Sequence, residues 1–386
     1  MMRVPVQFNR FRASMAFLGA ALMLGSVSAQ AADSGVHKGF FVKSPDENFK
    51  LGIGARVQSR LTYLSTDGAE ETLSDDKMRF AIQRARLTLK GHVWNKNLQY
   101  KFQTDFGKGS VSLKDFFVDY QLVEGLHIRT GQWKMPFSRQ QLTSSSRLEL
   151  VDRAITDKAF GAGRDIGIAL HNNLGKSPEW EWAIGVFNGT GVNSSLSGRV
   201  DTDAGSITSG KFSNVPGQFV PTLAMRVGYN YGGIKGYSEG DQRGGGLRFA
   251  VGASSLMGLD LDDQDDMDVR GEVDFVLKAR GLALTGAWFQ AMEQEGKSAM
   301  DQAAGLSGYH LQMSYHLDDK FVPVARYARL SEEGPNNDRR EYVAGVASYF
   351  YGHKVKWQSD FGAEVSEVAG EEPTDYRFRT QLQVTF

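Results

Sequence analysis

The last twelve residues of the chain alternate strictly between apolar and polar side chains. Because side chains on a strand alternate with a period of two, the apolar ones share one face. They are Tyr376, Phe378, Leu382, Val384 and Phe386. A chain that stops on the last residue of a strand leaves an unpaired sheet edge, unless that strand pairs with the first one to close a barrel. A terminal Phe on such a strand is typical of bacterial outer-membrane barrels, and the alternative is the edge strand of a soluble sandwich.

The start of the chain has the pattern of a secretory signal peptide. Arg3, Arg10 and Arg12 precede the apolar run 16–24, and Ala29-Gln30-Ala31 follows as a small-x-small cleavage site. The apolar run is too short for a membrane-spanning helix, and no later segment approaches about 20 continuous apolar residues. Removing residues 1–31 takes away three of the 44 basic residues and none of the 45 acidic ones, which leaves a net charge of −4.

The composition favours many hairpins in a single domain. Gly is abundant (44 residues) and Pro scarce (9), which suits tight turns and bulges, and helical periodicity is almost missing. Cys is absent, so the sheet would be closed by hydrogen bonds and not by disulfides. No linker divides the chain. We therefore expect a signal peptide at 1–31, a periplasmic N-terminal segment at 32–48 and a β-barrel domain at 49–386.

Sixteen segments show strand character, which predicts an all-β, 16-stranded antiparallel transmembrane β-barrel. Their connections alternate between long and short, as expected for long external loops and short periplasmic turns; 107–110 and 232–244 are exceptions. The segments are 49–64, 76–93, 97–106, 111–122, 126–135, 164–172, 179–187, 219–231, 245–257, 267–279, 281–290, 306–317, 320–330, 338–351, 353–365 and 375–386.

The same alternation predicts a mainly basic lumen. A barrel of sixteen strands is too wide for side chains to fill, so it would enclose water, and a basic wall would attract anions. The inward acids are Asp105, Asp115, Asp119, Glu272, Asp274 and Asp360. The inward basic residues are Lys50, Arg56, Arg60, Arg84, Arg86, Lys90, Lys101, Arg226, Arg248, Arg270, Lys278, Arg326, Lys354, Lys356, Arg377 and Arg379.

One long connection, 136–163, contains the only convincing amphipathic helix. Ser146-Arg-Leu-Glu149 has the form of a capping box, and Leu148, Val151, Ile155 and Ala159 would form its apolar stripe. We expect this helix to pack its stripe against the inner wall and narrow the pore; the alternative is an external flap.

Several motifs resemble the phosphate-selective porin O and P family. They are Gly131-Gln-Trp-Lys-Met-Pro-Phe-Ser138, Leu142-Thr-Ser-Ser-Ser-Arg147, Asp152-Arg153, Gly163-Arg-Asp-Ile-Gly167 and Arg84-Ala-Arg86-Leu-Thr-Leu-Lys-Gly91, together with the terminal strand. The resemblance implies a homotrimeric porin with sixteen strands and an inward-folded third external loop.

The resemblance also implies which residues would hold anions. In phosphate-specific members the loop carries a Lys, a Ser pair three residues on, and an Arg beyond. Ser144, Ser145 and Arg153 match that pattern, but Gln141 stands at the Lys position, which leaves phosphate specificity open. The predicted channel-lining and anion-binding residues are Arg60, Arg84, Arg86, Lys101, Gln141, Ser144, Ser145 and Arg153.

The expected function is therefore an outer-membrane porin, with a water-filled and anion-preferring channel for phosphate or other small anions such as carboxylates. The alternatives are a general-diffusion or other-solute porin without phosphate specificity, and a structural or adhesive barrel. The seven His are scattered and form no catalytic or metal constellation, so we expect neither enzymatic activity nor a cofactor or metal. The expected partners are small anions, outer-membrane lipid and lipopolysaccharide, with no nucleic acid.

Overall fold

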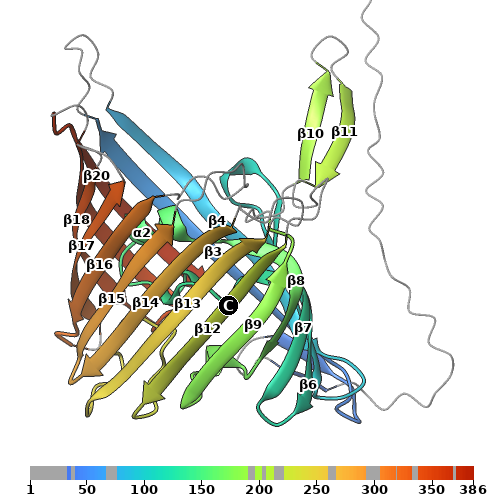
Figure 1. Cartoon of the computed structure of the whole chain (residues 1–386). Helices are drawn as coiled ribbons and strands as arrows, with labels where there is room; N and C mark the ends of the chain where they lie inside the picture. The colour runs from blue at the N-terminus through green and yellow to red at the C-terminus, as the bar shows by residue number, and fades with distance from the viewer. Residues whose placement is uncertain are drawn as a thin grey trace, which may run out of the picture.

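Sixteen antiparallel strands form a closed barrel in the computed structural model (Figure 1), which confirms the predicted fold class. The structure describes residues 33–35, 40–66, 76–189, 196–201, 206–212, 221–259, 267–292, 305–318, 320–332, 338–367 and 371–386. The predicted signal peptide lies outside these ranges. The barrel strands are β3 (Lys50–Ser65), β4 (Lys77–His92), β5 (Leu98–Asp105), β6 (Ser112–Val123), β7 (Leu126–Lys134), β8 (Arg164–His171), β9 (Trp180–Phe187), β12 (Thr222–Tyr231), β13 (Arg248–Leu259), β14 (Met267–Ala279), β15 (Leu282–Met292), β16 (Leu306–Tyr315), β17 (Phe321–Glu332), β18 (Asp338–Tyr349), β19 (Val355–Ser366) and β20 (Thr374–Thr385).

The terminal strand closes the barrel as its alternation predicts. β20 pairs antiparallel with β3 from Tyr376 opposite Ser65 to Thr385 opposite Arg56. Beyond the end of β20, Phe386 and Ala55 exchange both backbone hydrogen bonds, at 2.8 and 2.9 Å. The two faces differ sharply in exposure, since Phe378 is 41% exposed on the outside and Arg379 is 4% exposed on the inside.

A short strand from the N-terminal segment continues the sheet where β20 stops. β2 (Phe40–Lys43) pairs with β3 from Phe40 opposite Ile53 to Lys43 opposite Lys50, and β1 (Asp33–Gly35) pairs with β2. β3 is longer than its contact with β20, so β2 covers backbone groups that would otherwise form a free edge. The segment predicted at 32–48 thus contributes strands of its own.

Apart from the connection 232–247 between β12 and β13, the turns at one rim are short (Figure 1). The β6–β7 and β14–β15 turns have two residues each. In the β14–β15 turn, Arg280 and Gly281 both have positive φ, at 50° and 86°; this conformation suits a two-residue hairpin. Two further strands, β10 (Leu196–Asp201) and β11 (Ser206–Phe212), form a separate antiparallel pair between β9 and β12. Short 3₁₀ turns span Gly107–Gly109 and Leu174–Lys176. No helix within the described ranges is long and apolar enough to cross a membrane.

The connection between β7 and β8, residues 135–163, is called L3 below, and it is less helical than predicted. It contains α1 (Arg139–Leu142) and α2 (Ile155–Phe160), whereas residues 146–154 are turns and bends. The predicted capping box does not form, because the Ser146 hydroxyl bonds to Ser144 instead. The apolar stripe is nevertheless buried: Leu148, Val151 and Ile155 are all at most 3% exposed. The helical spacing therefore predicted correctly which side chains are buried, but it predicted the wrong backbone conformation for residues 146–154.

L3 packs its apolar side onto one half of the inner wall. The same cluster contains Met135, Phe137, Ile155 and Phe160 of L3 and wall residues from β7–β9, β12, β13 and β15–β17. Those wall positions are small or apolar, for example Ala224, Leu256 and Phe289. Burial of this surface is the main term that holds the loop in place. This half of the barrel therefore contains a packed core, and only the other half has room for water.

Candidate channel and its lining

The turn between β12 and β13, residues 232–247, also folds into the barrel and contacts L3. Arg139 of L3 donates to the carbonyl of Gly236 at 3.3 Å, and Gln140 donates to Glu239 at 3.2 Å. The backbone N–H of Glu149 donates to the other Glu239 oxygen at 2.8 Å. Sequence reasoning noted this turn only as an exception in length. That length was the available signal, because a hairpin needs only two to five residues.

Charges on the filled half of the barrel neutralise one another. Arg226, on β12, is fully buried and pairs with Asp274 at 2.7 Å, Glu181 at 3.2 Å and Glu272 at 3.4 Å. Arg139 adds a second guanidinium to Asp274. A buried charge is tolerated only when it is paired in this way. The predicted inward base Arg226 and the predicted inward acids Glu272 and Asp274 thus offset one another on this half.

Asp152 of L3 holds the loop to the wall. It accepts hydrogen bonds from Arg60 at 2.8 Å and from Arg379 at 3.0 Å, and Arg84 lies 3.9 Å away. Burial alone would raise the pKa of Asp152, but these guanidiniums outweigh it and hold the pKa well below its usual range. Asp152 thus stays ionised and keeps three wall arginines engaged.

Two basic side chains bind the carbonyl groups at the C-terminal end of α1. Lys134 Nζ donates to the carbonyls of Gln141, Leu142 and Thr143. Arg153 donates to the carbonyl oxygens of Gln140 and Thr143, both at 2.8 Å. Carbonyl oxygens at a helix C-terminus have no partner within the helix, and a cation satisfies them. These contacts hold residues 140–143 in place and thereby position the serines 144–146 that follow them.

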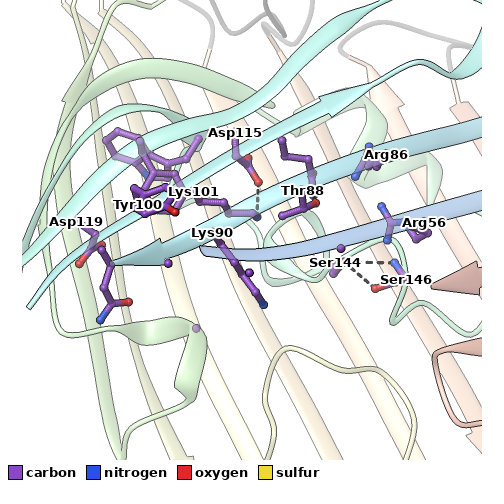
Figure 2. A pocket seen from close by; sticks show the side chains of 18 of the residues that line it. Arg56, Arg86, Thr88, Lys90, Tyr100, Lys101, Asp115, Asp119, Ser144 and Ser146 are labelled. Atoms are coloured by element: carbon purple, nitrogen blue, oxygen red, sulfur yellow. Dashed lines mark hydrogen bonds and ion pairs between the residues drawn. The ribbon is translucent and has the colours of Figure 1, made fainter. Parts of the chain in front are cut away.

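The water-filled half is a cavity of about 1760 Å³ that is lined mainly by β3–β8, by residues 144–147 of L3 and by the N-terminal segment. Tyr237 of the 232–247 turn and a few residues of β9, β19 and β20 complete the lining. On one side of the cavity, Arg56 donates to the hydroxyl of Ser145 at 3.1 Å, and the Ser144 and Ser146 hydroxyls lie 2.9 Å apart. Figure 2 shows Arg56 beside Ser144 and Ser146, with Arg86 on the neighbouring strand.

The lining of this cavity has a large excess of positive charge. It contains twelve Lys and Arg side chains and only three carboxylates, from Glu47, Asp115 and Asp119. Asp115 is shared by Arg164 at 2.6 Å and Lys101 at 2.5 Å. Arg56 and Lys90 form no ion pair within the described part of the chain, and the Nε of Arg56 is buried without a hydrogen-bond partner there. The unpaired positive charge of the lining therefore attracts anions into the cavity.

Comparison with known proteins agrees with this architecture. The sequence model of the family described as phosphate-selective porin O and P matches residues 52–386. The chain belongs to this family. It is 24% identical over 349 residues to an uncharacterized protein of Aquifex aeolicus, and the alignment covers 80% of each chain.

Solved outer-membrane porins share the fold of this porin. The loop L8 deletion mutant of OmpT from Vibrio cholerae has a TM-score of 0.58 at 9% identity, covering 87% of this chain and 99% of the other. Salmonella typhi OmpF in complex with daunomycin has a TM-score of 0.57 at 14% identity, with coverage of 88% and 99%. The anion-selective porin from Comamonas acidovorans has a TM-score of 0.54 at 13% identity, with coverage of 87% and 99%. The protein is thus an outer-membrane porin with a barrel channel.

The eight predicted site residues of this porin fall into two groups. Arg86, Lys101, Ser144 and Ser145 line the cavity. Arg60, Arg84, Gln141 and Arg153 are absent from its lining; they contact L3 or belong to it. Arg56, Arg129 and Arg164 line the cavity but were not chosen as site residues. Arg56 and Arg164 could have been, because the alternation turns Arg56 inward and Arg164 belongs to the Gly163-Arg-Asp motif.

One contact between L3 and the 232–247 turn involves a carboxyl group that titrates near neutral pH. Burial raises the pKa of Glu149 to about 7, and the nearby negative charge of Glu239 acts in the same direction. Glu149 Oε1 lies 3.8 Å from His316 Nε2. The two elements that fill the porin therefore meet at a group whose charge changes in the neutral range.

Proposed function

We propose that this porin is an anion-preferring diffusion channel for small anions, including phosphate and carboxylates. The observation that carries the proposal is the cavity lining, with twelve basic side chains against three carboxylates. A narrow water-filled space with low-dielectric walls focuses such a field and raises the local anion concentration. Arginine stays charged at all relevant pH values and offers a planar fork to phosphate or carboxylate oxygens.

The proposed channel does not require tight binding of phosphate. Gln141 takes the position of a loop lysine in the phosphate-specific pattern, and its side chain does not line the cavity. Arg86, Lys101 and Arg164 already have carboxylate partners at 2.5–2.7 Å, which weakens their hold on a passing anion. Weak sites in series allow an anion to enter and also to leave. We infer preference for anions as a class, with phosphate as a poor blocker of chloride current.

Reversal potentials of the reconstituted porin in a potassium chloride gradient test this function. We expect a potential whose sign corresponds to chloride permeating faster than potassium. The preference should weaken as salt rises, because the Debye length falls from about 10 Å at 0.1 M to about 3 Å at 1 M. A pore that passes potassium in preference to chloride would refute the proposal. A barrel without single-channel current would favour the structural or adhesive alternative.

We further infer a homotrimer that is exported after removal of residues 1–31 and surrounded by lipid and lipopolysaccharide. Support comes from the family and from one structural neighbour, described as the trimer form of Vibrio cholerae OmpT, at a TM-score of 0.56 and 11% identity. Unheated protein should run on gels as an oligomer and shift to about the chain mass after boiling. A single monomeric species in mild detergent, measured by light scattering, would contradict the trimer.

A further inference from the structure

One stretch of the cavity wall combines free positive charge with an aromatic surface. Lys90 of β4 lies opposite Lys101 of β5, and Lys101 lies opposite Phe117 of β6. On the next two strands the register continues through Gly131 and Gly167, which have no side chains. Across five neighbouring strands, this row of the inner wall therefore consists of two lysines, one aromatic ring and two positions without side chains.

Aromatic rings lie close to Gly167 and to Phe117. Trp133 lies with its ring centroid 6.3 Å from Phe117 and 5.0 Å from Phe187. A Cβ at Gly167 would come within 2.6 Å of the Phe187 ring, so the close approach of this ring requires a glycine. Phe187 is fully buried, whereas Phe117 is only partly buried and lines the cavity.

The guanidinium of Arg129 extends this flat surface. Its Cζ lies 4.3 Å from the centroid of Phe117 and 5.8 Å from that of Trp133. Arg129 is held there by Asp119 at 2.6 Å. A guanidinium that stacks on an aromatic ring presents a planar surface to its other side as well. The wall next to Lys90 and Lys101 is therefore planar, partly apolar and wetted by the cavity.

A small hydrated anion interacts with the lysines of this wall but gains nothing from its aromatic part. An anion with a carboxylate at one end and an aromatic ring at the other would match it, because the ring can leave water against Phe117 while the carboxylate faces the lysines. Lys90 is suited to hold the carboxylate, since it is exposed and forms no ion pair within the described residues. Figure 2 shows Lys101 joined to Asp115, with Lys90 on the adjacent strand.

We propose that the cavity wall formed by Lys90, Lys101, Phe117 and Arg129 is a binding site for aromatic carboxylates. This inference rests on the proposed anion channel and names the class of anion that the channel holds longest. The ring lies against Phe117 and the Arg129 guanidinium, and the carboxylate interacts with Lys90 and Lys101. Inorganic phosphate and acetate pass the same wall with little retention.

Block of chloride current by benzoate and by acetate in planar bilayers tests the site. Benzoate should block at roughly tenfold lower concentration than acetate, as expected from the burial and stacking of one ring. Phe117→Leu should weaken block by benzoate several-fold and leave block by acetate unchanged. Lys90→Gln should weaken block by both anions. The matched control is Phe116→Leu, the same change one residue earlier on the outer face, which should have no effect.

The outcomes separate this inference from the proposed function. Equal block by benzoate and acetate, in a pore that still prefers chloride to potassium, would overturn the site and leave the anion channel standing. Stronger block by benzoate that persists in Phe117→Leu would also overturn it, because the ring would then bind elsewhere. A pore that prefers potassium would overturn the anion channel, and the site with it.

Discussion

Removing residues 142–158 is expected to raise the single-channel conductance of this porin several-fold. These residues form the side of L3 that borders the cavity, and they carry the contacts of Asp152 with the wall. Conductance of a water-filled pore grows with its open cross-section, and a sixteen-stranded barrel without its inner loop encloses a wide channel. The measurement is the current step on insertion of single channels into a planar bilayer.

The deletion also removes partners from buried wall residues, so its control must separate an open pore from a damaged barrel. Arg60 and Arg379 would lose Asp152, and water would then fill the vacated space and solvate them. A heat-modifiable band on gels would show that the barrel still forms. A matched variant that shortens the 232–247 turn across residues 235–242 should widen the pore less, because this turn contributes only Tyr237 to the lining that the structure describes, whereas L3 contributes Leu142 and residues 144–147. Unchanged conductance in the 142–158 deletion would place L3 outside the conducting path.

The barrel could be predicted from the sequence because alternation has a short period and strong physical consequences. Each strand must present apolar side chains to lipid, so Phe378 and Arg379 could be assigned to opposite faces without a structure. Strand β4 shows the limit of this reasoning. A bulge opposite Gln58 and Ser59 shifts the register, and alternation does not show on which residue such a bulge falls.

The candidate site could be predicted only in part, because the pattern shows that a residue points inward but not what it then meets. Arg56 and Arg226 have the same inward character in the sequence, yet Arg56 faces the cavity and Arg226 is buried among three carboxylates. That difference is created by the 232–247 turn and by L3, whose positions depend on contacts distant in sequence. Helical spacing failed over 146–154 for a similar reason: tertiary contacts such as that of Glu149 with Glu239 replaced the helix.

Arg56→Glu is expected to lower the preference of the pore for chloride over potassium by roughly threefold or more, because it changes the local charge by two units in a confined space. Arg56 is the wall residue best placed for this effect. It donates to Ser145 on the facing loop at 3.1 Å and has no carboxylate partner within the described ranges, so its charge is not already offset. The preference is read from reversal potentials in a salt gradient at low ionic strength, where screening is weakest.

The matched control is Arg243→Glu. Arg243 is exposed on the 232–247 turn and is absent from the cavity lining; within the described part of the chain, its side chain donates to the carbonyl of Gly233 and forms no ion pair. The same charge reversal there should change the reversal potential much less, because solvent screens an exposed charge that does not line the cavity. Arg56→Gln, which removes one charge, should give about half the effect of Arg56→Glu in free energy. An unchanged reversal potential in Arg56→Glu, with conductance and heat-modifiable migration intact, would show that the path of the anions does not pass between β3 and the serines of L3.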